Sequence, residues 1–211
     1  AGYKVGLLDL TQGELGTRGS PPLRLQEAEE ARKRMGALVR ENLGMADGFF
    51  QHNEENLRKI IRLLRRYRPN IVLANALSDR HPDHGRAAKL TADACFFSGL
   101  RRIETYQEDG SPQEQWRPKT VYHYIQDHHR RPDFVVDISG FMERKMETVF
   151  AFKSQFYDPD SPEPASPISS KEFIDFLYAR ARNFGRPAGF DFAEGFEATR
   201  RFGVKDLHHL F

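Results

Sequence analysis

The residues best suited to chemistry are two histidines, His81 and His84. They lie in the run 78–86, Ser-Asp-Arg-His-Pro-Asp-His-Gly-Arg, directly after the apolar stretch 71–74. Because Pro82 favours the first position of a helix, both imidazoles would lie on one side of a helix start, about one turn apart. One neutral imidazole could ligate zinc, while the other could hydrogen-bond a developing oxyanion or move a proton. From spacing alone, ordinary capping and surface roles are the commoner explanation of a lone His-x-x-His, and the position at the carboxyl end of a strand favours metal chemistry.

The charge balance and the cysteine content exclude several classes of protein. Among the 211 residues, 32 Lys and Arg stand against 30 Asp and Glu, a formal net charge of +2. Nucleic-acid binding needs a basic surface that this balance does not provide, so we expect no nucleic-acid partner. No apolar run approaches the ~20 residues of a membrane helix, so we expect no membrane partner. The single cysteine, Cys95, excludes an internal disulfide and favours a reducing cytoplasm.

Short apolar stretches alternate with longer amphipathic ones, which predicts one α/β domain over residues 1–211. We expect a Rossmann-like, mostly parallel sheet flanked by helices. The expected strands are 3–10, 38–43, 71–74, 120–125 and 134–138, and the expected helices are 21–35, 53–67, 82–100, 140–156 and 171–184. The Gly-, Ser- and Pro-rich residues 11–22 form a loop at the carboxyl end of the first strand, where ligands gather in such folds.

The beginning of the sequence has an unusual pattern for this fold. The apolar stretch 3–10 is typical of a strand buried on both faces of a parallel sheet. Gly2, directly before it, is typical of the residue that ends a helix. An α/β fold rarely starts between a helix and its following strand, so we expect that a first strand and helix are missing from this chain.

Four short motifs, in order along the chain, resemble those of the LmbE-like (PIG-L) zinc de-N-acetylases. They are Thr11-Gln12-Gly13-Glu14, Leu23-Arg24, His81-Pro82-Asp83-His84 and Ser154-Gln155-Phe156. The resemblance covers essentially the whole chain. Within the family, residues 3–20 and 78–90 are most similar to the bacillithiol-pathway enzymes that deacetylate N-acetylglucosaminyl-malate.

The resemblance implies a zinc ion held by a His and an Asp of an N-terminal Ala-His-Pro-Asp-Asp motif together with His84. It also implies that His81 stabilises the oxyanion or acts on the leaving amine, and that Arg24 and Arg117 are cationic pocket residues. The Ala-His-Pro-Asp-Asp motif, which also supplies the general base, does not occur in this sequence. We therefore expect the activity to belong to a longer parent protein, and relatives suggest a homo-oligomer, a trimer or hexamer.

Five further positions have expected roles or open interpretations. Asp47 could hydrogen-bond sugar hydroxyls, although an Asp-Gly turn explains it equally well. Asp127 is expected to line the pocket and His129 to lie in a hydrated loop, while His123 and Asp127 remain an alternative source of metal ligands. Arg24 follows the loop after the first strand, and we expect its guanidinium to contact an anionic part of the substrate.

The favoured hypothesis is a zinc-dependent hydrolase that removes acetyl groups from N-acetylglucosamine conjugates, with N-acetylglucosaminyl-malate as the leading substrate. The alternative is a catalytically inactive remnant or a sugar-binding module of the same fold. A nucleotide-binding α/β protein is disfavoured, because residues 11–16 contain neither a Gly-x-Gly-x-x-Gly pattern nor a Walker lysine.

Overall fold

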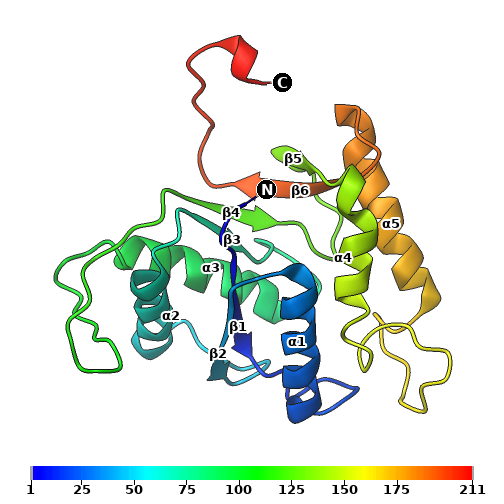
Figure 1. Ribbon diagram of the computed structural model, residues 1–211, viewed down its shortest axis with the longest axis horizontal. Coiled ribbons are helices and arrows are strands. Elements are labelled where there is room, and N and C mark those ends of the chain that lie inside the picture. The colour runs from blue at the N-terminus through cyan, green and yellow to red at the C-terminus, as the bar shows by residue number, and fades with distance from the viewer. Residues whose placement is uncertain (1, 211) are drawn as a thin grey trace.

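The computed structural model describes residues 2–210 and confirms the α/β class (Figure 1). The strands are β1 (Gly6–Thr11), β2 (Val39–Met45), β3 (Ile71–Ala74), β4 (Thr120–Tyr124), β5 (Phe134–Asp137) and β6 (Ala193–Ala198). The helices are α1 (Pro21–Met35), α2 (Glu54–Tyr67), α3 (Pro82–Phe97), α4 (Met142–Val149) and α5 (Lys171–Gly185), with short 3-10 turns at Ser139–Phe141, Arg186–Ala188 and Leu207–Leu210. Among these helices, none is long and apolar enough to cross a membrane.

The strands form two separate sheets. Strands β1 and β2 pair in parallel, with α1 as the connection between them. The second sheet has the order β3-β4-β6-β5, in which β3 and β4 are parallel and β6 runs antiparallel to both of its neighbours. The parallel pairs β1–β2 and β3–β4 agree with the expected parallel sheet, and the antiparallel strand β6 makes the second sheet mixed.

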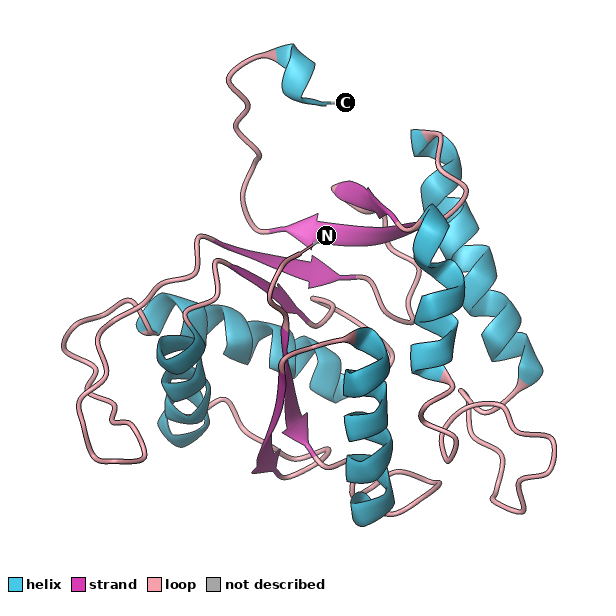
Figure 2. Cartoon of the chain, viewed as in Figure 1, coloured by secondary structure: helices cyan, strands magenta, loops and turns pink. Residues whose placement is uncertain are grey.

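Helices cover the strands on more than one side (Figure 2). In the view of Figure 1, α1 lies on one side of β1 and β2, and α2 and α3 lie on the other. Helices α2 and α3 enclose an apolar core that includes Ile60, Ile61 and Leu90. Helices α4 and α5 form a second core around Met142 and Met146. The region between these cores is where the carboxyl ends of several strands meet the helices.

Local signals explain where the main helices begin and end. The side chain of Asn53 accepts a hydrogen bond from the backbone N–H of Asn56 at 2.9 Å and so caps α2. At the other end Arg68, with φ of 49°, adopts a left-handed conformation before Pro69. Helix α1 starts with two prolines and ends at Gly36, whose φ is 73°. The predicted bounds of these helices therefore agree with the structure to within one residue.

The expected burial of the first strand on both faces is wrong. Leu8 of β1 is 38% exposed, and Ile71 and Leu73 of β3 are 57% and 54% exposed. Among residues 2–210, β1 pairs only with β2 and β3 pairs only with β4. The other edge of each strand has no strand partner, so its apolar side chains lack the neighbours that would cover them.

Two further elements differ from the expectation. Helix α4 ends at Val149, well before residue 156, and residues 150–156 form turns in its place. Strand β6 is not predicted from the sequence, because its residues Ala-Glu-Gly-Phe-Glu-Ala include no β-branched side chain. The strand is nevertheless largely buried. Its residue Glu197 pairs with Arg130, and a Cβ at Gly195 would lie 3.0 Å from the ring of Phe184, which packs on the strand.

Candidate active site

His81 and His84 lie together at the start of α3, where the strand β3 and a short loop lead into the helix. His81 is the N-cap residue, and its Nδ1 accepts a hydrogen bond from the backbone N–H of Asp83 at 3.2 Å. The two imidazole centroids are 5.3 Å apart. Gly85 allows this tight start, because a Cβ there would lie 3.2 Å from the carbonyl oxygen of Leu77.

Asp79 holds the ring of His84 through Nδ1. Its side chain is completely buried, and Oδ2 accepts a hydrogen bond from Nδ1 of His84. Oδ1 accepts two more, from the backbone N–H groups of Asp127 at 3.0 Å and His128 at 2.7 Å. Burial alone would raise the pKa of Asp79, but the hydrogen bonds from His128 and His84 outweigh it and lower the pKa below its usual value. Asp79 is therefore ionised at neutral pH. We call Asp79, His81 and His84 the histidine corner.

The hydrogen bonds of the histidine corner assign opposite tautomers to the neutral forms of its two imidazoles. An ionised carboxylate only accepts hydrogen bonds, so Nδ1 of His84 carries the proton and Nε2 is the acceptor. That Nε2 accepts a long hydrogen bond, 3.5 Å, from the Nε2 amide of Gln126, which lines the same cavity. Nδ1 of His81 instead accepts a backbone N–H, so its Nε2 carries the proton. His84 thus has the form of a metal ligand backed by a carboxylate, and His81 has the form of a hydrogen-bond donor.

Both histidines line a cavity of about 910 Å³. Its wall comes from the loop after β1, the start of α3, the segment after β4, helix α5 and strand β6. The structure brings five of the six predicted site residues to this cavity, namely Arg24, Asp47, His81, His84 and Asp127. The volume is of the size that holds a small ligand such as a sugar conjugate.

Arg24 reaches the cavity from α1 across the loop that follows β1. Its Nη2 donates to the backbone carbonyl of Arg18 at 3.2 Å and to Oε1 of Gln155. The guanidinium packs so closely on the loop that a Cβ at Gly13 or Gly16 would overlap it. Burial lowers the pKa of Arg24, although its guanidinium stays charged.

Asp47 holds the same loop from the end of β2. Its carboxylate accepts hydrogen bonds from Oγ1 of Thr11 at 3.4 Å and from the backbone N–H of Leu15 at 3.1 Å. The backbone N–H of Asp47 donates to Glu14 at 2.8 Å, which lowers the pKa of that carboxyl group. Asp47 therefore orders the loop and also faces the cavity.

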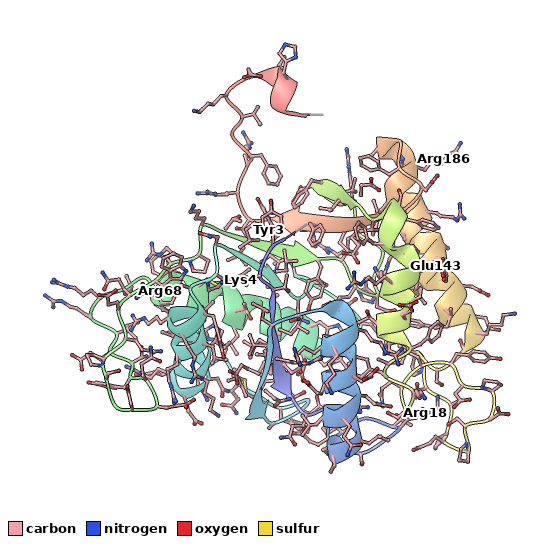
Figure 3. All side chains as sticks on the ribbon, viewed as in Figure 1. Tyr3, Lys4, Arg18, Arg68, Glu143 and Arg186 are labelled. Carbon is pink, nitrogen blue, oxygen red and sulfur yellow. The ribbon has the colours of Figure 1, made fainter. Side chains whose placement is uncertain are left out.

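Arg18 connects this loop with a distant part of the chain. It is buried, and its guanidinium donates to the carbonyl of Phe156 at 3.4 Å and to the hydroxyl of Ser161. Figure 3 shows Arg18 beside the loop that follows α4. The Ser-Gln-Phe motif at 154–156 is thus part of the cavity's support.

Arg117 does not reach the cavity. It is exposed, lies over the ring of Phe96 at 4.5 Å and donates to the Phe96 carbonyl at 3.0 Å. Phe96 is near the last turn of α3, whereas the histidines are at the first. Nothing in the structure supports substrate contact by Arg117, because the length of α3 separates it from the histidine corner.

The residues after β4 have different environments. Asp127 lines the cavity and pairs through Oδ2 with Nε of Arg80 at 2.7 Å. His129 lies in an exposed loop, as expected. His123 is fully buried in β4, with Nδ1 2.8 Å from the carbonyl of Asn75, and is not part of the cavity wall. His123 and Asp127 therefore do not form a joint ligand set.

Sequence reasoning missed four residues of the cavity region. Asp79 is within the histidine motif but had no assigned role. Tyr124 lies near the carboxyl end of the predicted strand 120–125 and Gln126 directly follows that strand, a position that could have identified them. Burial raises the pKa of Tyr124 to about 12, so its hydroxyl keeps its proton at neutral pH. Arg180 lines the cavity from the middle of α5 and had no signal in the sequence.

His84 is the side chain of this cavity whose surroundings best fit a zinc ligand. Within residues 2–210, no group of three or more His, Cys, Asp or Glu side chains could hold a metal ion. The unprotonated Nε2 of His84, which has only the 3.5 Å contact with Gln126 and is backed by Asp79, fits a single imidazole ligand.

Comparison with known proteins assigns the chain to a class. Residues 1–95 match the family described as PIG-L: GlcNAc-PI de-N-acetylase. A solved structure of the conserved protein TT1542 from Thermus thermophilus is 33% identical, with a TM-score of 0.82 over 97% of this chain and 86% of that one. The chain belongs to the PIG-L de-N-acetylase family.

Two further relatives carry a named activity. The diacetylchitobiose deacetylase of Thermococcus kodakarensis is 26% identical over 205 residues, which cover 92% of this chain and 72% of that protein. The N,N'-diacetylchitobiose deacetylase from Pyrococcus horikoshii, solved with its inhibitor MPG, has a TM-score of 0.77 and 22% identity over 100% of this chain and 79% of that one. The second of these similarities establishes a shared fold.

Proposed function

We propose that this protein is a zinc-dependent hydrolase that removes the acetyl group from an N-acetylglucosamine conjugate. The observation that carries the proposal is the pair of opposite tautomers in the histidine corner, one suited to bind a metal ion and the other to donate a hydrogen bond. The family match and the named deacetylases among the relatives support the reaction class.

His84 would hold the metal through Nε2. The resemblance to the family assigns the other protein ligands and the general base to an Ala-His-Pro-Asp-Asp motif, which this sequence does not contain. When bound, zinc polarises an amide carbonyl and lowers the pKa of a coordinated water to about 7. Asp79 keeps the His84 ring in the ligand orientation, since it holds Nδ1 from the buried side.

The remaining residues would bind and orient the substrate. His81 would donate a hydrogen bond from its Nε2–H to the acetamide oxygen as negative charge develops there. Asp47 accepts hydrogen bonds from sugar hydroxyls with the capacity left by its loop contacts, and Arg24 donates through Nη1, which has no partner among residues 2–210. Asp127 contributes a further acceptor beside Arg80.

We propose N-acetylglucosaminyl-malate, the substrate of the bacillithiol pathway, as the conjugate. The similarity of residues 3–20 and 78–90 to the enzymes of that pathway supports this choice. The alternative is a sugar-binding module that keeps the cavity without hydrolysis.

The decisive experiment measures zinc content after dialysis and acetate release from N-acetylglucosaminyl-malate for the complete protein that the gene encodes and for its His84→Ala variant. We expect zinc and activity in the first and neither in the second, because His84 supplies a metal ligand. If the protein binds acetylated sugars but hydrolyses none of them, the sugar-binding alternative holds. Acetate release that does not depend on zinc would contradict the proposal.

A further inference from the structure

The cavity contains several cationic side chains, and one of them differs from the rest. Five Lys and Arg side chains line it, namely Arg18, Arg24, Arg80, Lys145 and Arg180. Four of these are engaged, since Arg80 pairs with Asp127, Lys145 with Glu194, and Arg18 and Arg24 donate to the groups described above. Arg180 makes no hydrogen bond and no ion pair with any of residues 2–210.

The surroundings of Arg180 explain why it stays unpaired. Its guanidinium lies over the ring of Phe176, 5.1 Å from the centroid. The carboxylates near enough to act on it are Asp127, Glu194 and Asp79. Each of them is already committed, to Arg80, to Lys145 and to His84. Arg180 therefore shares the charges of these carboxylates with other partners and makes no hydrogen bond with any of the three.

An unpaired guanidinium that is partly removed from water is costly. Burial lowers the pKa of Arg180 and the three nearby carboxylates raise it, but a guanidinium remains charged at neutral pH. A ligand that supplied two oxygens would restore the lost hydrogen bonds, because the planar guanidinium matches carboxylate and phosphate groups in a bidentate way.

The position of Arg180 indicates which part of a substrate it meets. Asp79, which holds His84, is among the charges that act on Arg180, so Arg180 belongs to the histidine end of the cavity. Arg24 is at the loop after β1, with Nη2 already engaged. If the acetamide of an acetylated sugar lies at the two histidines, the other substituents of the sugar lie toward Arg24 and Arg180.

We propose that Arg180 is a specificity-determining residue that binds an anionic group, a carboxylate or a phosphate, carried by the substrate outside its acetamide. This inference rests on the proposed function and extends it, because it defines the substrate class as N-acetylated sugars with a negatively charged substituent. It assigns anion recognition to Arg180 in place of Arg24.

The test is a binding measurement on the 211-residue chain, which requires neither metal nor turnover. Calorimetry would compare N-acetylglucosaminyl-malate, N-acetylglucosamine 1-phosphate and the neutral methyl N-acetylglucosaminide. The variants are Arg180→Gln, Arg180→Lys and Arg182→Gln. Arg182 is a matched control, since it is exposed on the same helix and lies over Phe192 at 4.7 Å. Circular dichroism would confirm that each variant is folded.

We expect the chain and Arg182→Gln to bind at least one anionic sugar more tightly than the neutral glycoside. Arg180→Gln should weaken that anionic ligand about 10- to 100-fold and leave the neutral glycoside unchanged, since a hydrogen bond to a charged group is lost. Arg180→Lys should lose part of the affinity because it keeps the charge without the planar fork. The two anionic ligands distinguish carboxylate from phosphate.

Two results would overturn the inference, and they separate it from the proposed function. If the neutral glycoside binds but the anionic sugars have no advantage, or if Arg180→Gln retains the advantage, Arg180 does not recognise an anion while the proposed function stands. If no acetylated sugar binds at all, the proposed function fails together with the inference.

Discussion

The histidine corner and the arginine side of the same cavity are built in different ways. Asp79, His81 and His84 contact one another and the start of α3 within six residues of sequence. Arg24 is instead held by Gln155, which is 131 positions away. Residue spacing can therefore predict a site formed by one turn of chain, whereas a site assembled from distant segments depends on how those segments pack.

The strongest loss is expected at the metal ligand of the histidine corner. His84→Ala should abolish both zinc binding and acetate release in the zinc-binding form of the protein, because it removes the imidazole whose Nε2 faces the cavity and whose Nδ1 is held by a carboxylate. Metal analysis and an acetate assay measure this. His52→Ala is the control, since His52 pairs with Asp93 on the surface. Equal zinc content and unchanged activity in His84→Ala would refute the assignment.

The second expected effect separates the two histidines. His81→Ala should lower turnover by about 10²–10³ with zinc content retained, since the loss of one oxyanion donor typically has this effect. His81→Asn keeps a side chain that can cap α3 and therefore controls for helix stability. Loss of zinc in both variants would show that His81 is a ligand.

A smaller effect is expected from Asp79, the residue that orients His84 in the histidine corner. Asp79→Asn should lower metal affinity or activity about 10- to 100-fold, because a residue that orients a ligand is lost although the ligand itself remains. Asp127→Asn is the matched control for metal affinity, since its backbone N–H still donates to Asp79. If both substitutions change zinc affinity equally, Asp79 has no special role in orienting His84.

The weakest effect is expected for Arg24, on the arginine side of the cavity. Arg24→Lys should raise KM about 10-fold, because lysine has one nitrogen, which cannot hold Gln155 and the Arg18 carbonyl and also reach the substrate as Nη2 and Nη1 of Arg24 do. We expect similar increases for neutral and anionic N-acetylglucosaminides, with Arg32→Lys, on the same helix and paired with Glu29, as the control. A much larger increase on the malate conjugate would return anion recognition to Arg24.

The local elements of this protein could be predicted from its sequence alone. The bounds of α1 and β3 agree with the structure, and those of α2 and α5 differ by one residue, because capping residues, prolines and apolar periodicity act over a few positions. The histidine corner was predictable for the same reason. Its chemistry follows from a strand, a proline and a helix start that are adjacent in the chain.

Packing between distant segments determines which apolar strands are covered and which side chains meet. β1 and β3 are apolar but partly exposed, whereas β6 is polar in sequence and largely buried, since burial depends on the neighbours that the tertiary structure supplies. Packing likewise placed Arg117 on Phe96, outside the cavity, and Arg180 within it. Whether a charged side chain meets a partner is set by contacts across the whole chain, which no local pattern records.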